Sequence, residues 1–237
     1  MSEQAHWEEV YRERQPQQVS WYEPAPDTSL ALIKQAGLSG EAPIIDVGAG
    51  ISALAGRLLE AGYSDVTVAD ISAVALARAK AALGDAASRV TWICADVRTH
   101  AFAGRYQLWH DRAVFHFMVQ PEDRDRYLAV LRRTLDPAGH LILATFGPDG
   151  PTQCSGLAVT RYSEQALLAL MGTEFTLLSS RLVEHRTPSG ASQQFLYTHW
   201  RREPTGDPDT QRELILPPGR VPHESAARRA MWLREWS

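Results

Sequence analysis

The chain has 237 residues, of which 44% are hydrophobic and 22% are charged, as in a globular protein with one substantial core. Its formal net charge of −4 gives no general attraction to nucleic acid or to anionic membranes, so we expect neither as a partner. The two cysteines have no disulfide or metal-ligand spacing, and no apolar signal or membrane-spanning run is found. These features predict a cytoplasmic protein without a metal site.

The N-terminal segment 1–40 is predicted to form a helical lid. Residues 5–13 have a helical pattern that places Trp7 and Tyr11 on one face, and Trp21 follows in a later aromatic pair. Each aromatic side chain is equally well explained as apolar cover for a sheet edge. Three of them ahead of a ligand-binding turn favour a lid over that turn.

Residues 43–53 predict a buried first strand, a glycine turn and the start of a helix. Gly48 and Gly50 allow a close ligand approach that a Cβ would hinder, and the helix presents free N–H groups at its first turn. The spacing Gly48-x-Gly50-x-x-Ala53 also fits a dinucleotide fingerprint. The carboxylate of Asp46 suits a ligand ammonium group better than a pyrophosphate, which it would repel. S-adenosylmethionine carries such an ammonium; a nicotinamide cofactor and a turn without ligand are the alternatives.

Three successive strands are predicted to finish on an acid, at Asp46, Asp70 and Asp96. The ligand crevice of an open parallel sheet lies outside the carboxyl ends of its strands, so these carboxylates are expected along one rim. Asp70 can accept both ribose hydroxyls, and Asp96 can accept from the exocyclic amine of adenine. Helix capping is the alternative, above all for Asp70, which precedes a helix. A shared ligand explains three acids at successive strand ends better than three separate helix caps do.

The remaining pattern predicts an α/β fold: a Rossmann-like, doubly wound, seven-stranded and mostly parallel sheet with a C-terminal antiparallel hairpin. The sheet domain is expected at residues 41–202, and a tail of unknown role, with a short helix over 228–236, at residues 203–237. Helices are expected at 27–37, 52–61, 73–83, 121–134 and 163–171, and strands near 43 and at 66–69, 90–95, 107–110, 140–146, 175–184 and 193–202.

These motifs resemble those of the class I S-adenosylmethionine-dependent methyltransferases, with Asp46-Val-Gly48-Ala-Gly50 as the first motif. The resemblance covers residues 5–202 and implies S-adenosylmethionine as the cofactor. It places Asp70-Ile71 at the ribose and Asp96-Val97 at the adenine. The N-terminal aromatic residues resemble the front segment of the elongation-factor lysine methyltransferases, in which such residues line the cofactor.

The stretch Asp111-Arg112-Ala113 resembles the thiopurine-methyltransferase-like group, whose Asp-Arg-Gly-Ala stretch lies beside the methionine part of the cofactor. This likeness implies that Arg112 is a cofactor-side residue. It also favours a small-molecule acceptor, most readily a thiol, because the lysine-methyltransferase branch has a different sequence here. Protein lysine is the runner-up acceptor. A nicotinamide-dependent oxidoreductase and a cofactor-binding module without turnover are the alternatives of other classes.

Two further residues are candidates for chemistry at the rim. His116 follows the fourth strand and is the candidate to receive a proton from the acceptor, with a packing role as the alternative. Cys154 lies in a turn-rich loop, 147–156, and is either a recognition group or an inert thiol, the second being favoured. The acceptor atom and the oligomeric state are not indicated by the sequence.

Overall fold

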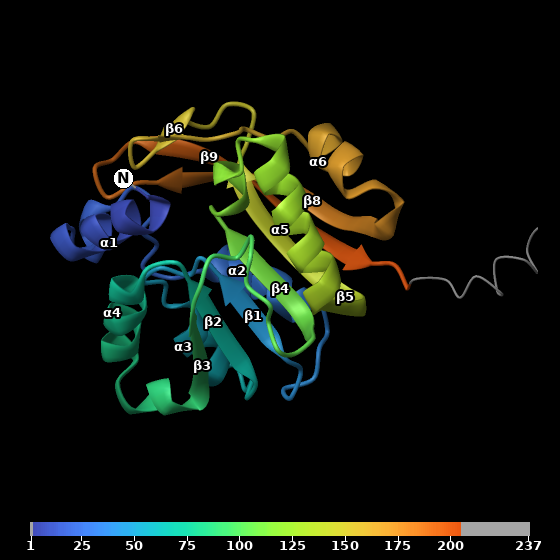
Figure 1. Cartoon of the computed structure of the whole chain (residues 1–237), viewed down its shortest axis with the longest axis horizontal. Helices are drawn as coiled ribbons and strands as arrows, with labels where there is room; N and C mark the ends of the chain where they lie inside the picture. The colour runs from blue at the N-terminus through green and yellow to red at the C-terminus, as the bar shows by residue number, and fades with distance from the viewer. Residues whose placement is uncertain (1, 205–237) are drawn as a thin grey trace, which may run out of the picture. The chain divides into compact units, whose positions relative to one another are not determined.

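The computed structural model describes residues 2–204, which are built on a seven-stranded sheet of order β3-β2-β1-β4-β5-β9-β8 (Figure 1). The first five strands are parallel, whereas β9 runs antiparallel to both β5 and β8. The expected doubly wound fold with a C-terminal hairpin is therefore confirmed. The strands are β1 (Ile44–Val47), β2 (Val66–Asp70), β3 (Val90–Cys94), β4 (Tyr106–Arg112), β5 (Leu135–Phe146), β8 (Phe175–Arg186) and β9 (Ser192–Arg202), with a separate pair, β6 (Gln153–Cys154) and β7 (Leu157–Ala158).

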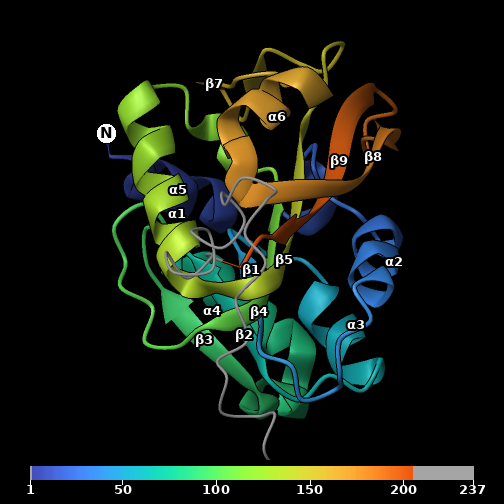
Figure 2. The ribbon, with the colours of Figure 1, turned by 90° about the vertical axis from the view of Figure 1, so that its right-hand side faces the viewer.

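Helices cover both faces of the sheet. Ile44 and Ile45 are adjacent in β1 and both fully buried, because alternate side chains of a strand point to opposite faces. Ile44 belongs to the core beneath α2 and α3, and Ile45 to the core beneath α5 and α6 (Figure 2). The helices are α1 (Glu3–Glu13), α2 (Asp27–Gln35), α3 (Leu54–Glu60), α4 (Ala73–Leu83), α5 (Pro121–Thr134) and α6 (Glu164–Met171), with 3-10 turns η1 (Pro16–Gln18), η2 (Gly84–Arg89), η3 (Phe115–Phe117) and η4 (Gly172–Glu174).

Two local predictions need correction. The strand expected at 140–146 begins earlier, because β5 starts at Leu135, directly after α5. Its pairing with β4 shifts register, from Tyr106 opposite Leu135 to Leu108 opposite His140, so the extra residues form an irregularity within the strand. The loop 147–156 was expected to be irregular, but the short hairpin β6–β7 begins inside it. The helix expected over 228–236 lies outside the described residues.

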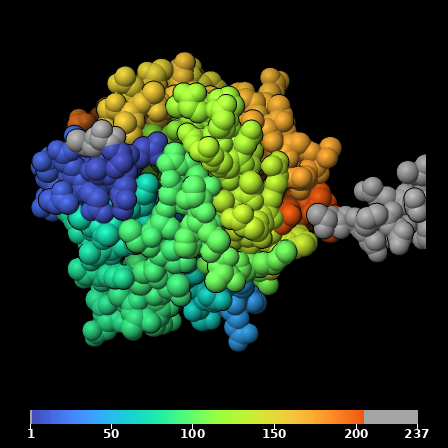
Figure 3. All heavy atoms as spheres, in the orientation of Figure 1, coloured from blue at the N-terminus to red at the C-terminus, as the bar shows by residue number. Residues whose placement is uncertain are grey.

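The N-terminal helix α1 lies against α4 (Figure 3). The Glu8 carboxylate accepts hydrogen bonds from the backbone N–H of Ala73, at 2.8 Å, and of Val74, at 3.4 Å, which are the first residues of α4. Arg78 of α4 donates in return to the carbonyl oxygen of Tyr11. A carboxylate at a helix N-terminus is stabilised by the helix dipole, so this contact fixes α1 beside the sheet rim. The lid role of segment 1–40 stays a prediction.

No helix within residues 2–204 is long and apolar enough to cross a membrane.

Candidate functional site

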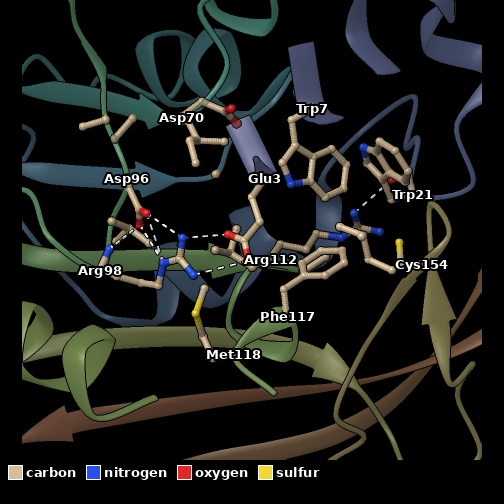
Figure 4. Close-up of a pocket in the computed structure, with 18 of the residues that line it drawn as sticks. Glu3, Trp7, Trp21, Asp70, Asp96, Arg98, Arg112, Phe117, Met118 and Cys154 are labelled. Atoms are coloured by element: carbon tan, nitrogen blue, oxygen red, sulfur yellow. Dashed lines mark hydrogen bonds and ion pairs between the residues drawn. The ribbon is translucent and has the colours of Figure 1, made fainter. Parts of the chain in front are cut away.

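A cavity of about 240 Å³ lies where the carboxyl ends of β1 to β4 meet α1. One side of it is charged and the other is aromatic (Figure 4). We call Glu3, Asp70, Asp96 and Arg98 the charged end, and Trp7, Trp21, Phe117 and Cys154 the aromatic end.

The cavity brings together nearly all the residues predicted to bind the cofactor. Asp46 lines a smaller adjoining cavity instead, and Gly50 lies in the turn between β1 and α3 and lines neither cavity. Shared placement agrees with a single ligand site, while the individual roles stay predictions. The predicted residues that line the main cavity are Trp7, Tyr11, Trp21, Gly48, Asp70, Ile71, Asp96, Val97 and Arg112.

Two separate constraints require glycine at positions 48 and 50. Gly48 and Gly50 have φ values of 58° and 57°, in the left-handed region that disfavours a Cβ. A Cβ on Gly48 would also stand 1.9 Å from the Val114 side chain, and one on Gly50 would stand 2.3 Å from the Tyr11 hydroxyl. The turn is thus packed against Val114 and Tyr11, which line the cavity, and any larger residue at position 48 or 50 would collide with them.

Asp70 connects the end of β2 to the glycine turn. Its two carboxylate oxygens accept from the backbone N–H of Gly50 and of Ser72, each at 2.8 Å. Ser72, and not Asp70, is the N-cap of α4, because its hydroxyl accepts from the N–H of Ala75. Burial raises the pKa of Asp70 to about 6 despite these hydrogen bonds. Each oxygen keeps a second lone pair that a ligand hydroxyl can use.

Asp96 is paired with Arg98, two residues further along the chain. Its carboxylate accepts from the backbone N–H of Arg98 at 2.9 Å, and the Arg98 guanidinium donates to both of its oxygens. Arg98 also pairs with Glu3 of α1 at 2.7 Å and with Asp123 of α5 at 3.5 Å. The guanidinium keeps the pKa of Asp96 low although burial opposes this. Both oxygens of the carboxylate are therefore occupied by Arg98, and the adenine role of Asp96 stays a prediction.

Asp111 is structural and fixes the turn that follows β4. It is fully buried and accepts from the backbone N–H of Val114 and Phe115 and from the hydroxyl of Tyr127. Burial raises its pKa to about 6. These contacts hold Ala113 at a φ of 70°, so the chain reverses here and exposes this turn to the cavity.

Arg112 reaches the aromatic end from the end of β4. Its Nε donates to the Tyr197 hydroxyl at 2.9 Å, and Nη1 donates to the carbonyl of Trp21 at 3.0 Å. Nη2 lies 3.0 Å from a carboxylate oxygen of Glu23, but the angle does not make a hydrogen bond. The guanidinium also stands over the ring of Phe195, at 4.7 Å from its centroid. Arg112 is thus fixed in place with N–H groups to spare.

The structure corrects the expectation for His116. Its ring is fully buried, does not line the cavity and accepts from the backbone N–H of Phe146 through Nδ1, at 3.3 Å. Burial lowers the pKa of His116 to about 3, so the ring stays neutral. A packing role therefore describes His116 better than the role of proton acceptor. Cys154 does line the cavity, and burial raises the pKa of its thiol to about 11.

The cavity residues that sequence reasoning missed include Glu3, Arg98 and Met118. Glu3 lies four residues before Trp7, at helical spacing, so extending that helix by one turn would have found it. Arg98 follows Asp96 by two residues, and a paired charge at a strand end is a usable signal. Met118 has no such signal, because only the 3-10 turn before it brings its side chain to the cavity.

A parallel sheet closed by an antiparallel hairpin, a glycine turn after β1 and carboxylates at the strand ends together define a class I methyltransferase domain. Residues 44–139 match the family model described as a methyltransferase domain. The chain therefore carries a domain of the S-adenosylmethionine-dependent class, and the predicted family and its cofactor are confirmed. The nicotinamide-dependent alternative is left without support.

Similar proteins agree with this assignment. A malonyl-[acyl-carrier protein] O-methyltransferase of Anoxybacillus flavithermus (strain DSM 21510 / WK1) is 31% identical over 106 residues, which span 44% of this chain and 39% of that relative. A structure from work on the conversion of a disulfide bond into a thioacetal group during echinomycin biosynthesis superposes with a TM-score of 0.68 at 20% identity, covering 89% of this chain and 97% of the other.

Another similar structure is the 1,6-didemethyltoxoflavin-N1-methyltransferase of Burkholderia thailandensis with bound 1,6-didemethyltoxoflavin and S-adenosylhomocysteine. Its TM-score is 0.60 at 22% identity, and the match covers 82% of this chain and 81% of that one. At these identities the two structures establish the fold and not the acceptor.

Proposed function

We propose that this protein transfers a methyl group from S-adenosylmethionine to a small-molecule nucleophile, most readily a thiol, by in-line displacement. The observation that carries the proposal is one continuous cavity with a charged end and an aromatic end. When bound, S-adenosylmethionine supplies the methyl group and a sulfonium leaving group. The chain then has to align the acceptor with that methyl group and keep water away from it.

The charged end suits the adenosine part of the cofactor. Gly48 allows the turn to pack closely against Val114 beside the cavity, and the free lone pairs of Asp70 suit two ribose hydroxyls. At the far edge, Arg98 moves toward Glu3 and Asp123, and Asp96 accepts the adenine amine. Glu3 belongs to α1, so this movement also tightens the contact between the N-terminal helix and the rim.

The aromatic end suits the acceptor because it is apolar and lacks a usable base. Among residues 2–204, its only titratable side chains beside Arg112 are the Cys154 thiol and the adjoining Tyr11 hydroxyl, and burial raises the pKa of both. A general base works best with a pKa near the working pH, which neither group has. The acceptor must therefore arrive already ionised, or lose its proton to water after transfer.

A thiolate meets this requirement, because free thiols have a pKa of about 8.5 and react as the anion. A carboxylate meets it as well, and the matching relative is a malonyl-[acyl-carrier protein] O-methyltransferase. Carboxylate O-methylation is thus the second candidate. A lysine ammonium is a poorer acceptor, since it has to lose a proton before it can attack, and protein lysine ranks behind both.

The test is methyl transfer from labelled S-adenosylmethionine to separate panels of small thiols, carboxylates and protein fractions. A thiol acceptor predicts a rate that rises with pH through about 8.5, whereas a carboxylate acceptor predicts no rise through that region. Asp70→Ala serves as the inactive control. Label in protein lysine, with no turnover of either small-molecule panel, would contradict the proposal.

A further inference from the structure

Three polar side chains form an unbroken hydrogen-bonded chain beneath the glycine turn. Asp46 Oδ1 lies 2.7 Å from His110 Nδ1, and His110 Nε2 lies 2.9 Å from Ser29 Oγ. All three residues are buried, with exposed fractions of 2% for Asp46, 3% for His110 and 1% for Ser29. Burying a carboxylate and an imidazole costs free energy that the apolar alternatives at these positions would not.

The fold brings these three hydrogen-bonded side chains together. Asp46 of β1 and His110 of β4 are direct partners across two parallel strands, so their side chains emerge on the same face of the sheet. That face is the one covered by α2, which supplies Ser29. The elements β1, β4 and α2, which are far apart in the sequence, therefore each contribute one side chain to this set of hydrogen bonds.

The chemistry of the groups fixes the direction of each hydrogen bond. Asp46 as a carboxylate can only accept, so His110 donates through Nδ1–H. When the ring is neutral, Nε2 accepts a hydrogen bond from the Ser29 hydroxyl. These hydrogen bonds hold the imidazole in one orientation behind the negatively charged carboxylate of Asp46.

That charge faces a ligand site. Asp46, His110 and Ser29 line a cavity of about 50 Å³, which Gly48 and Arg112 share with the main cavity. The hydrogen bond between Asp46 and His110 is made through Oδ1, which leaves Oδ2 free of the imidazole. The two cavities share lining residues at the glycine turn, beside the carboxylate that the sequence predicts to suit a ligand ammonium group.

We infer that His110 and Ser29 are positioning residues that hold Asp46 in one orientation, with Oδ2 directed at the ammonium group of the bound cofactor. This inference rests on the proposed function and adds to it the two residues behind the carboxylate. The same order of groups occurs in serine hydrolases. Here Ser29 faces only the small cavity, which has no room for a second substrate, so the chain orients a carboxylate and does not generate a nucleophile.

Two ligands separate this role from a merely structural one. S-adenosylhomocysteine has an ammonium group, whereas 5′-methylthioadenosine has the same adenosine and sulfur without the amino-acid chain. Calorimetry with the full chain would give the dissociation constant of each ligand for the wild type and for Ser29→Ala, His110→Asn, His110→Leu, Asp46→Asn and the double variant Asp46→Asn/His110→Leu.

We expect His110→Leu to weaken S-adenosylhomocysteine binding by roughly tenfold, as for loss of one charged hydrogen bond, and to leave 5′-methylthioadenosine within twofold. His110→Asn keeps a donor for Asp46 and should recover most of the affinity, and Ser29→Ala should cost a few-fold. The double variant should be no weaker than Asp46→Asn, because His110 acts through that carboxylate.

Equal weakening of both ligands, no weakening of either, or additive losses in the double variant would overturn the inference. If His110→Leu does not fold, Ser29→Ala and His110→Asn decide by the same ratio of the two affinities. A wild type that binds neither ligand would instead refute the proposed function, so the two failures are distinguishable.

Discussion

The two ends of the cavity are built by different means. Two acids of the charged end, Asp70 and Asp96, stand at the ends of β2 and β3, and α1 adds only Glu3. The aromatic end is instead assembled from α1, the segment before α2, the turn after β4 and the β6 strand. In the proposed function, a rigid sheet edge holds the cofactor, and loops shape the part that faces the acceptor. The comparison teaches that the acceptor can change while the cofactor site stays the same.

The largest expected effect tests the charged end. Asp70→Ala removes the acceptor for the ribose hydroxyls and leaves the N–H groups of Gly50 and Ser72 without a partner. We expect S-adenosylhomocysteine affinity to fall by roughly 10- to 100-fold, measured by calorimetry, as for charged hydrogen bonds worth about 1.5–3 kcal/mol. Asp65→Ala, which removes an exposed acid just before β2, is the matched control and should bind normally. Unchanged affinity in folded Asp70→Ala would place the ribose elsewhere.

The pH dependence of cofactor binding tests the same carboxylate. Burial raises the pKa of Asp70 from 3.8 to about 6, so below pH about 6 the proton competes with ligand hydroxyls, and affinity should fall by up to tenfold per pH unit. The folded apo protein binds this proton more tightly than the unfolded chain, so the contribution of Asp70 to stability rises as pH falls from about 6 toward 3.8. Asp70→Asn should abolish both trends.

Calorimetric titrations and urea unfolding between pH 4 and pH 8 would measure these trends, and the difference between wild type and Asp70→Asn isolates them. The subtraction matters because neutral, buried His116 contributes the opposite slope, losing stability as pH falls below 6.5. An affinity that is constant over this range would argue against the carboxylate as ribose acceptor.

A substitution at the aromatic end should affect acceptor binding much more than cofactor binding. Phe117 packs edge to face with Trp7, with 5.2 Å between the ring centroids, and lines the cavity. Phe117→Ala should raise the KM for the acceptor by roughly tenfold, as for loss of an aromatic contact, and leave the affinity for S-adenosylhomocysteine within about threefold. Leu182→Ala, at an exposed position of β8, is the control. Equal losses for both ligands would mean that the two ends are not separate sites.

The smallest expected effect concerns backbone strain at the boundary of the two ends. Ala113 has a φ of 70°, where glycine is favoured, so Ala113→Gly should raise stability by about 0.5–1 kcal/mol, or the melting temperature by about 2 °C. Ala138, with a φ of 62° in the irregular part of β5, is the matched control. Both variants should gain stability, but only Ala113→Gly should lower kcat, because it loosens the turn beside Arg112.

The charged end could be read from the sequence, because a buried apolar strand that stops at an acid fixes where its carboxylate emerges. Asp70 and Asp96 were found in this way, whereas the salt bridge from Arg98 to Glu3 joins residues of unrelated segments and leaves no periodic signal. His116 shows the limit at the aromatic end. Its position after a strand suggests the rim, but the 3-10 turn η3 directs its ring into the core.

The contact between Glu8 and the start of α4 has a consequence for detecting movement of α1. The amides of Ala73 and Val74 are protected by a side chain from another helix, while the amide of Ala75 is protected locally by Ser72. Separation of α1 from α4 would therefore expose the first two amides and spare the third. The ratio of their hydrogen-exchange rates is a built-in measure of how often the N-terminal helix opens, available from the unmodified protein.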